Sequence, residues 1–586
     1  MAYAGLDIGT SNCCCYVALG QKGKPDVVPS NMGAHVTPSC VAYTDKNILV
    51  GEPARQQQSS NPLNTFVEFK RVIGRTYDER SLWKDAKHWA FSLARPNPES
   101  EPDGAPRYTA MHCGDIMRLT AVDLYTVLVM RMVQSLTDHI GADVPLRSLV
   151  ITVPAHFDHS QRKQTLEAVS KAGVACRVRV FNEPSAAIIA YAENRTDIRP
   201  GETVLVFDLG AGTLDVTCVR ITQPHQYDIL GSEGCCDLGG ADFDQRIMSM
   251  AAAHYKQHTQ RDLRTNKIKL VNVRNACEQA KKTLTVASET TIHIDDDVAP
   301  LTVTREAFEA AIAPELRRCS ELVRHLLQRL HLTPADLHHV ILCGGSSRVP
   351  GVRRAVKAIF PNIEPLTNIN ADECVALGAC LFARDASVFR DDGGDDDDGG
   401  DDDDGGDDDD DDDGNVDGGD DRDVDGDVDG NGSHTDGGDG GCDDNDGGED
   451  DDGDDGDDDA ECRKDKSGTG CGERLVVRDV APHTIGIRTG ENIMLPLVAR
   501  GAMLPAAATQ KLVPQHKRQK YADICVYQGE ESNTEKNKYL GFVRLRNLRE
   551  GHPVVTLVLA VGVDAIIRID ARDDEGHRVI GKIVLR

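Results

Sequence analysis

The chain has 586 residues, with 65 Lys and Arg against 96 Asp and Glu, and its formal net charge is −31. Residues 391–460 hold 38 of the acidic residues and a single basic one, so that segment carries −37 and the other 516 residues carry +6. The acidic isoelectric point therefore reflects one polyanionic segment and gives almost no information about the folded parts. At about 100–200 residues per domain, the length predicts three or four folded units.

The cysteine pattern argues against a zinc finger or a thioredoxin-type redox centre, because the 18 cysteines are scattered and none are spaced Cys-x-x-Cys. The N-terminus has no basic and apolar secretory signal, and no apolar run approaches the roughly 20 residues of a membrane span. We therefore expect a soluble protein of a reducing compartment, with no membrane partner. In such a protein Cys13, Cys14 and Cys15 pack as small apolar side chains in a strand.

Residues 1–390 alternate strand-like and helix-like runs, which is the pattern of an α/β domain. In chain order the pattern predicts a buried strand at 150–154, a helix at 160–173 that stops at Gly173, a buried strand at 204–207, an amphipathic helix at 319–331 and a strand at 339–342.

The rest of the chain changes character twice. Residues 391–460 are nearly all Asp and Gly without apolar periodicity, so we expect them to be disordered and extended, with 461–474 continuing the flexible stretch. Residues 475–586 predict a compact all-β module, because β-branched runs at 484–488, 524–527, 554–559 and 566–569 are separated by turn residues.

Two similar motifs follow strands about 200 residues apart. They read Asp7-Ile8-Gly9-Thr10 and Asp208-Leu209-Gly210-Ala211-Gly212-Thr213. In each, a glycine turn lets backbone N–H groups approach a phosphate, and the preceding carboxylate can hold Mg²⁺ through its waters. The repeat predicts a duplicated fold whose two lobes grip one nucleotide. No Gly-Lys-Ser/Thr motif is present, which disfavours a P-loop enzyme.

Two further segments suit the base and the ribose. Residues 276–285 predict a helix on which Glu278, Lys281, Lys282 and Thr285 share one face. Taken alone, an exposed charged face is the commoner explanation of that pattern. Residues 343–348 read Cys-Gly-Gly-Ser-Ser-Arg after the strand 339–342, and the paired glycines would let the backbone lie flat against a base.

Several motifs in the same order resemble the seventy-kilodalton heat-shock chaperones, the DnaK-like family. The main ones are Gly5-Leu6-Asp7-Ile8-Gly9-Thr10-Ser11, Asn182-Glu183-Pro184-Ser185-Ala186-Ala187, residues 206–215 and Gly344-Gly345-Ser346-Ser347-Arg348-Val349-Pro350. The resemblance runs from about residue 3 to 385 and resumes from about 475 to 586. It implies an α/β, actin-like, two-lobed ATPase domain with duplicated ribonuclease-H-like cores at 1–390, a disordered acidic linker at 391–474 and a peptide-binding β-sandwich at 475–586.

The resemblance also implies roles for individual residues. Those implied for catalysis are Lys70, Glu183, Asp208 and Thr213. Asp7 and Asp215 would hold the hydrated Mg²⁺. Those implied for the phosphates and adenosine of ATP or ADP are Gly9, Thr10, Ser11, Gly210, Gly212, Glu278, Lys281, Lys282, Thr285, Gly345, Ser346, Arg348 and Asp372. Peptide would contact Ile487, Ile524 and Ile566, and Arg179 and Asp479 would couple the domains.

The implied function is an ATP-dependent chaperone that hydrolyses ATP to regulate binding of unfolded polypeptide segments. Its implied partners are extended polypeptides, a J-domain co-chaperone and a nucleotide exchange factor. No direct nucleic-acid partner is implied, and the protein is expected to be a cytoplasmic monomer.

The sequence departs from the family pattern in four ways. Ala211 replaces a loop glycine, which costs about 1 kcal/mol if its φ is positive. Gly490 and Gln515 fall where the family builds a hydrophobic arch over the peptide. The family's helical lid is expected to be missing. The acidic segment, which could be a solvating spacer, a weak Ca²⁺ sequestrant or a surface for basic clients, is expected to weaken coupling between the domains.

These departures leave one alternative open, a nucleotide-bound scaffold or exchange-factor-like relative with little peptide binding or ATP turnover. Lys70, Glu183, Asp7 and Asp215 favour hydrolysis, whereas Gly490 and Gln515 favour the alternative. A sugar kinase or an actin-like filament protein would not explain residues 475–586.

Overall fold

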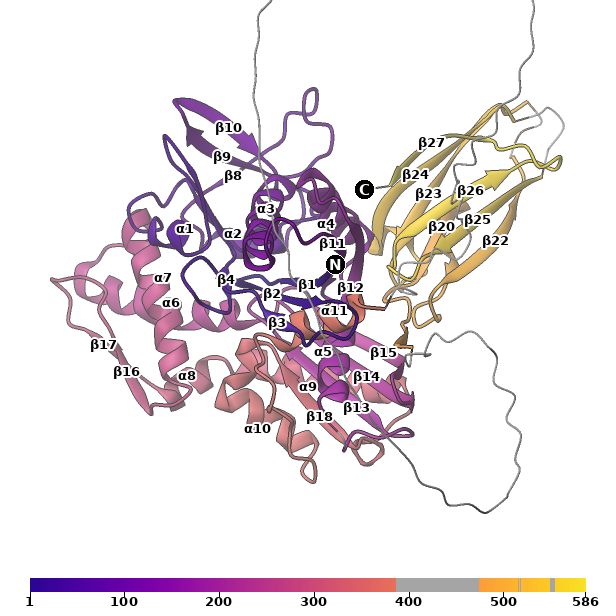
Figure 1. The fold of residues 1–586 in the computed structure, drawn as a ribbon. Coiled ribbons are helices and arrows are strands. Elements are labelled where there is room, and N and C mark those ends of the chain that lie inside the picture. The colour runs from indigo at the N-terminus through magenta and orange to yellow at the C-terminus, as the bar shows by residue number, and fades with distance from the viewer. Residues whose placement is uncertain (196, 386–473, 515, 517, 549–553, 586) are drawn as a thin grey trace, which may run out of the picture. The chain divides into compact units, whose positions relative to one another are not determined.

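This computed structural model (Figure 1) describes residues 1–195, 197–385, 474–514, 516, 518–548 and 554–585. Two large sheets organise the first part of the chain. The first has the strand order β12-β11-β1-β2-β3, with β4 also paired to β2, and the second has the order β18-β13-β14-β15-β19. The first sheet consists of β1 (Ala2–Ile8), β2 (Asn12–Leu19), β3 (Asp26–Val27), β4 (Thr37–Pro38), β11 (Leu146–Val153) and β12 (Arg177–Asn182). The second consists of β13 (Thr203–Leu209), β14 (Leu214–Gln223), β15 (Gln226–Cys235), β18 (His339–Cys343) and β19 (Val476–Arg478).

The two sheets repeat one topology. In each, an antiparallel hairpin (β1–β2 or β13–β14) places its first strand parallel to a later strand, β11 or β18. The two predicted glycine motifs therefore occupy equivalent places, the tight turns of the two hairpins. Cys13, Cys14 and Cys15 lie buried in β2, as the sequence predicts.

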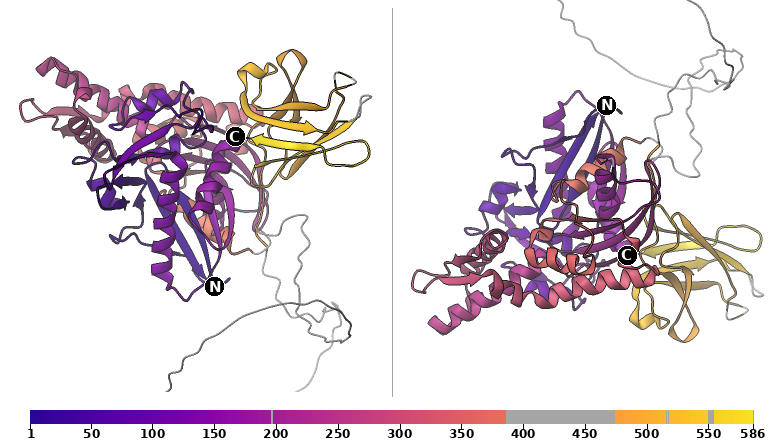
Figure 2. Two further views of the ribbon diagram at one scale, coloured as in Figure 1. Left: turned by 90° about the horizontal axis from the view of Figure 1, so that it is seen from above. Right: turned by 90° about the horizontal axis from the view of Figure 1, so that it is seen from below.

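Helices cover the two sheets in three apolar layers. One cluster packs β1, β2 and β11 against α3 and α4, and a second packs β13 and β14 against α6, α7, α9 and α10. A third cluster contains side chains of both sheets together with α5 and α11, so these two helices form a layer that the sheets share. Figure 2 gives two further views of this arrangement. The helices are α1 (Glu52–Gln56), α2 (Leu82–Ala86), α3 (Ala121–Ile140), α4 (His159–Lys171), α5 (Glu183–Glu193), α6 (Gly240–Thr259), α7 (Lys267–Thr283), α8 (Arg305–Ala311), α9 (Ala313–Arg329), α10 (Pro350–Ile359) and α11 (Cys374–Ala383).

Local chemistry accounts for the helix ends. Asp158 caps α4 by accepting a hydrogen bond from the Gln161 amide, and the chain leaves that helix at Gly173 with a φ of 71°. The helix predicted at 319–331 begins earlier, at Ala313, because Pro314 stands in its first turn, where its missing N–H has no cost.

The described residues between 485 and 585 form the two packed sheets of a β-sandwich, the architecture predicted for this part of the chain. One sheet has the order β21-β20-β23-β24-β27 and the other β22-β25-β26, and their inner faces share one apolar cluster. The strands are β20 (Ile485–Thr489), β21 (Ile493–Val498), β22 (Ala506–Leu512), β23 (Tyr521–Gln528), β24 (Lys538–Arg546), β25 (Val555–Val561), β26 (Ile567–Arg572) and β27 (Ile580–Leu585).

Smaller elements complete the described chain. Three small sheets consist of β5 (Cys40–Tyr43), β6 (Ile48–Val50) and β7 (Thr65–Val67); β8 (Leu93–Ala94), β9 (Arg107–His112) and β10 (Asp115–Leu119); and β16 (Glu289–Ile292) and β17 (Leu301–Thr304). Short 3₁₀ turns used below are η1 (Phe69–Arg71), η4 (Gly345–Arg348) and η6 (Gly490–Asn492).

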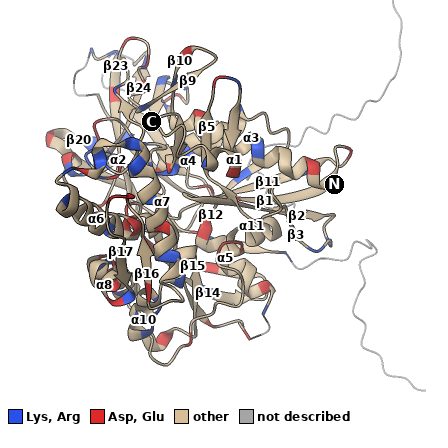
Figure 3. Cartoon of the chain, turned by 90° about the vertical axis from the view of Figure 1, so that its left-hand side faces the viewer, with Lys and Arg blue, Asp and Glu red and all other residues tan. Residues whose placement is uncertain are grey.

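Two general properties can be stated for the described ranges. None of their helices combines the length and apolar character of a membrane span. Figure 3 shows Lys and Arg interspersed with Asp and Glu over the elements, as expected once the acidic segment is set apart. That segment, 391–460, and most of the predicted linker lie outside the described residues.

Candidate functional site

The two hairpin turns meet across the site. A methyl group placed on Gly212 would lie 2.5 Å from Oγ1 of Thr10, so the β13–β14 turn touches the β1–β2 turn and leaves no room for a side chain. A methyl group on Gly9 would lie 2.3 Å from the carbonyl oxygen of Asn12, which explains the glycine in the other turn. Ala211 is not among the residues with positive φ, so the strain considered for this substitution does not arise.

Four carboxylates and one ammonium group gather beside these turns. Nζ of Lys70, in η1, lies 2.6 Å from Oε1 of Glu183, which begins α5. Asp7 accepts a hydrogen bond from Thr152 at 2.9 Å, and Asp215 accepts one from the His156 amide at 3.1 Å. Lys70 and Asp215 are 4% and 1% exposed. Strands from both sheets thus deliver carboxylates to one buried place.

The electrostatics of this cluster favour an added cation. Burial, and then the charge of Glu183, raises the pKa of Asp7 and of Asp215 to about 7. The same two causes hold the pKa of Asp208 well above its usual range. Burial opposes the charge on Lys70, but the Glu183 carboxylate outweighs it and raises the Lys70 pKa.

The donor set fits a hydrated divalent ion. Lys70 alone does not neutralise four neighbouring carboxylates, and a divalent cation would supply the missing charge. Within the described ranges no three His, Cys, Asp or Glu side chains converge closely enough to ligate an ion directly. Asp7 and Asp215 would therefore hold Mg²⁺ through its waters, which this ion is reluctant to lose.

The residues implied for adenosine are only partly brought together. A methyl group on Gly240 would lie 2.3 Å from Oγ of Ser346 and 3.0 Å from Nζ of Lys281, so α6, α7 and η4 meet there. Arg348 binds Asp372 at 2.6 Å, and Lys282 binds Glu278 at 2.6 Å.

Two details of this region correct or refine the expectations for residues 276–285 and 343–348. The predicted helix face ends early: α7 ends at Thr283, and Thr285 lies in the following turn, where its hydroxyl donates to the Lys282 carbonyl. Gly344 has a φ of 71° and leaves no room for a side chain beside Asp208, and a methyl group on Gly345 would lie 2.8 Å from Asp372.

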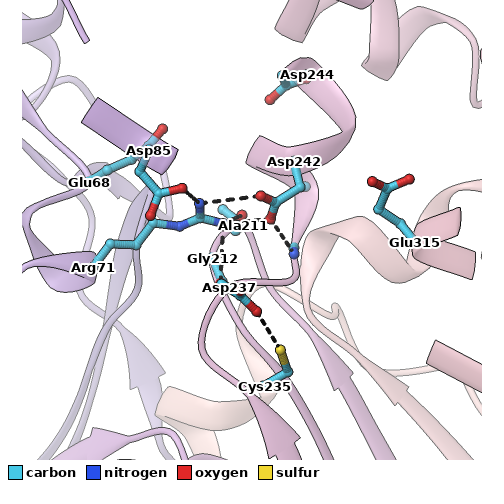
Figure 4. A network of polar contacts seen from close by, with 12 residues as sticks. Glu68, Arg71, Asp85, Ala211, Gly212, Cys235, Asp237, Asp242, Asp244 and Glu315 are labelled. Carbon is cyan, nitrogen blue, oxygen red and sulfur yellow. Dashed lines mark hydrogen bonds and ion pairs between the residues drawn. The ribbon is translucent and has the colours of Figure 1, made fainter. Parts of the chain in front are cut away.

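Arg71, which no sequence motif identified as a site residue, ties the two halves of the site together (Figure 4). Its guanidinium lies 2.9 Å from Oδ1 of Asp85 on one side. On the other side it lies 2.7 Å from Oδ2 of Asp242 and 3.2 Å from the Gly212 carbonyl oxygen. Burial opposes the charge, but the carboxylates of Asp242, Glu68 and Asp85 outweigh it and raise the pKa. A single Arg beside Lys70 carries no spacing signal that could have identified it.

The segment after the acidic tract contacts the second sheet and the start of α5, beside the candidate site. β19 pairs in parallel with β15 as the outer strand of the second sheet, and Arg478 binds Asp228 at 2.7 Å. Asp479 accepts hydrogen bonds from Asn182 at 2.7 Å and Ser185 at 2.9 Å. The Leu475 amide donates to the Asp385 carboxylate at 3.0 Å, which joins the two ends of the segment 386–473.

The two residues proposed for domain coupling contact different neighbours. The Arg179 guanidinium stacks over Phe382 at 5.7 Å, whereas Asp479 reaches the start of α5. Arg162, 1% exposed, was not anticipated. It donates to Asn182 at 2.7 Å and to the Asp564 carbonyl oxygen in the sandwich at 3.4 Å.

The proposed peptide residues lie in or beside the sandwich core. Ile487 and Ile524 are buried in the cluster between its sheets, and Ile566 is half-buried. A methyl group on Gly490 would meet nothing within 4 Å, so η6 presents no side chain for an arch at that position. Gln515 lies outside the described residues.

Comparison with known proteins gives one consistent result. A family model described as Hsp70 protein matches residues 3–390 and 466–583. The heat shock 70 kDa protein of Emericella nidulans is 28% identical over 574 residues, covering 97% of this chain and 75% of that protein. Heat shock cognate 70 kDa protein 3 of Dictyostelium discoideum is 28% identical over 589 residues, covering 99% and 79%. The heat shock 70 kDa protein of Trichophyton rubrum is 28% identical over 590 residues, covering 99% and 76%.

Proposed function

Because the chain belongs to the Hsp70 family, we propose that it hydrolyses ATP to ADP and phosphate and uses that cycle to bind and release unfolded polypeptide segments. The observation that carries the proposal is the buried Lys70–Glu183 pair, which stands among three aspartates where the two glycine turns meet. Gly9, Thr10, Ser11, Gly210, Gly212 and Thr213 would hold the phosphates.

The proposed reaction is in-line phosphoryl transfer to water. The bond between the γ-phosphorus and its bridging oxygen breaks while the water oxygen bonds to that phosphorus. Glu183 and Asp208 would orient the attacking water and accept hydrogen bonds from it. Lys70 would place positive charge beside the γ-phosphate, with its ammonium oriented by Glu183. Mg²⁺, held through water by Asp7 and Asp215, supplies further charge neutralisation when bound.

Lys70→Ala tests this mechanism in the full chain. We expect turnover to fall at least about a hundredfold, the size of a lost electrostatic donor, while the dissociation constant for a fluorescent ATP analogue changes little. Lys46→Ala, at an exposed position, removes the same charge and should leave turnover unchanged. Unchanged turnover in Lys70→Ala would remove the proposed role of Lys70.

Peptide binding needs a separate measurement. We propose that Ile487, Ile524 and Ile566 grip an aliphatic side chain, and that Asp479, Arg179 and β19 transmit the nucleotide state. ATP should then accelerate release of a fluorescent apolar peptide relative to ADP. A peptide that binds but dissociates at the same rate with either nucleotide would contradict the coupling.

One observation favours the second candidate, a nucleotide-bound scaffold or exchange-factor-like relative. The open space around Gly490 removes one side of the expected arch. If no unfolded polypeptide binds at any nucleotide state, this function replaces the chaperone cycle. We further propose a cytoplasmic monomer that works with a J-domain co-chaperone and a nucleotide exchange factor and does not bind nucleic acid directly.

A further inference from the structure

Two tyrosines in the first part of the chain have buried hydroxyl groups without partners. Tyr108 in β9 and Tyr125 in α3 are both 0% exposed, and neither hydroxyl has a hydrogen-bond partner among the described residues. Burying a hydroxyl group without a hydrogen bond is unfavourable, so native proteins rarely keep one unless another group uses it. Each of the two positions therefore needs an explanation.

The surroundings of the two hydroxyls differ. Tyr108 lies in an aromatic core, where its ring centroid is 5.2 Å from that of Phe66 and 5.5 Å from that of Phe91. Tyr125 packs edge-on against Phe69, with 6.2 Å between the ring centroids, and Phe69 directly precedes Lys70 in η1. Of the two tyrosines, Tyr125 is therefore the one beside the lysine of the proposed reaction.

The Tyr125 hydroxyl and the Lys70 ammonium also interact electrostatically. Burial raises the pKa of the Tyr125 phenol, and the charge of Lys70 is the largest effect that lowers it. Burial lowers the pKa of Lys70, whereas Glu183 and then Tyr125 raise it. Because such effects decay with distance, the two groups lie close together. The phenol is neutral at pH 7, so its oxygen offers lone pairs to a donor.

Lys70 has a donor for these lone pairs. Its ammonium group has three N–H bonds and can only donate. Within the described part of the chain, Glu183 is the one side chain that accepts from it, at 2.6 Å. In the proposed reaction a second N–H points to the γ-phosphate, and the third has no acceptor. Hydrogen bonds of this kind are often long until the substrate binds and then shorten.

We propose that Tyr125 is a positioning residue for ATP hydrolysis: when ATP binds, its hydroxyl oxygen accepts a hydrogen bond from the Lys70 ammonium and, together with Glu183, fixes the direction in which Lys70 points. The inference rests on the proposed function and adds a residue that no sequence motif indicates. Because Tyr125 acts through Lys70 and does not contact ATP, it affects the rate of hydrolysis and not the affinity for ATP.

Tyr125→Phe tests this role, since it removes the hydroxyl group and keeps the ring. In the full chain we expect kcat and kcat/KM for ATP hydrolysis to fall equally, by about tenfold, while the dissociation constant of a fluorescent ATP analogue stays unchanged. The free energy of unfolding in urea should not fall, because the lost hydroxyl has no partner. Tyr108→Phe is the matched control and should leave kcat unchanged.

A double-mutant cycle tests whether Tyr125 acts through Lys70. In single turnovers with excess protein, Tyr125→Phe combined with Lys70→Ala should hydrolyse ATP at the rate of Lys70→Ala alone. The hydroxyl then has no ammonium group to orient, so its removal costs nothing further.

The outcomes separate this inference from the function on which it rests. If Tyr125→Phe hydrolyses ATP at the original rate, the hydroxyl does not position Lys70, although the proposed ATPase function stands. If the substitution slows hydrolysis by the same factor in the Lys70→Ala background, Tyr125 does not act through Lys70. If nucleotide affinity and the free energy of unfolding fall together with turnover, its role is structural. If the original protein shows no ATP turnover, the proposed function fails and the inference fails with it.

Discussion

Two adjacent basic residues of η1 serve different parts of the site. Lys70 reaches Glu183 among the carboxylates, while Arg71 reaches Asp85 and, from the other half of the site, Asp242. Both side chains are buried, so each depends on its carboxylate partners to offset desolvation. The charge that the proposed reaction uses and the charge that joins the halves are therefore carried by neighbouring positions.

Arg71→Ala should destabilise the protein strongly, because it leaves Asp85 and Asp242 without their cation. We expect the free energy of unfolding in urea to fall by about 3–5 kcal/mol, the cost of breaking a buried ion pair. Arg95→Ala removes an exposed pair with Asp78 and should cost no more than about 1 kcal/mol. Equal effects of the two substitutions would contradict the structural role of Arg71.

Gly212→Ala should weaken nucleotide binding by separating the two turns. Its methyl group would meet Thr10 at 2.5 Å, whereas a methyl group on Gly210 has no neighbour closer than 3.8 Å. Neither glycine has a positive φ, so backbone strain does not distinguish them. We expect the dissociation constant of a fluorescent ATP analogue to rise roughly tenfold in Gly212→Ala, about 1.4 kcal/mol, and to stay nearly constant in Gly210→Ala. A larger loss in Gly210→Ala would show that turn contact is not the cause.

Among the elements, β19 makes long-range connections although it has only three residues. Its three residues extend the second sheet, and the next residue, Asp479, bonds the start of α5. The same helix begins with Glu183, so one short segment connects the sandwich to a residue of the proposed reaction.

Asp479→Ala should release this segment. The substitution leaves Asn182 and Ser185 without their acceptor, which costs about 1–3 kcal/mol for buried polar groups. Hydrogen exchange of the β19 amides should accelerate correspondingly, while exchange in β13 stays slow. Asp574→Ala, at an exposed position of the sandwich, is the matched control. Unchanged protection of β19 in Asp479→Ala would contradict this account.

Element by element, patterns within about ten residues were predictable and contacts across the chain were not. The strand at 204–207 and the stop at Gly173 follow from an apolar run and from a residue that tolerates positive φ. The early end of α7 before Thr285 carries no comparable local signal. The paired glycine turns were predictable because they repeat a motif.

The missed site residues share one physical reason. Arg71 finds its partners 14 and 171 positions away, and Arg162 reaches Asp564, 402 positions away. No local periodicity encodes such pairings. Packing between elements that are far apart in the chain brings these side chains together, η1 against α6 for Arg71 and α4 against the sandwich for Arg162.

At the scale of the whole molecule, buried histidines line the contact between α4 and the sandwich. Nδ1 of His159 accepts the Ile567 amide hydrogen at 3.1 Å, which requires a neutral ring. Burial, and then Lys163, lowers the His159 pKa to about 4, although Asp158 and Asp564 oppose this shift. Burial, and then His483, holds the pKa of His156 well below its usual range.

The contact should therefore weaken in mild acid. In the unfolded chain His159 takes up a proton near pH 6.5, whereas in the folded chain its pKa is about 4. The stabilising contribution of the neutral ring is therefore fully present above about pH 6.5 and is lost as the pH falls from 6.5 to 4. Glutamine keeps a hydrogen-bond acceptor but cannot titrate. Between pH 7 and pH 4.5, we therefore expect the free energy of unfolding in urea to fall by about 1–3 kcal/mol less in His159→Gln than in the original protein. Parallel pH profiles for the two proteins would contradict the role of this histidine.

The hydrogen bond between Leu475 and Asp385 has a consequence for how this architecture tolerates change. The chain leaves the described structure after Asp385 and is hydrogen-bonded to the same residue at Leu475, so the connection between them begins and ends at one place. Whatever its length, such a connection is a closed loop. Closing such a loop becomes more costly by only about 0.6 kcal/mol for each doubling of its length. The aspartate-rich segment can therefore be lengthened, shortened or replaced during evolution at little cost in folding free energy. The folded parts on either side would keep their geometry.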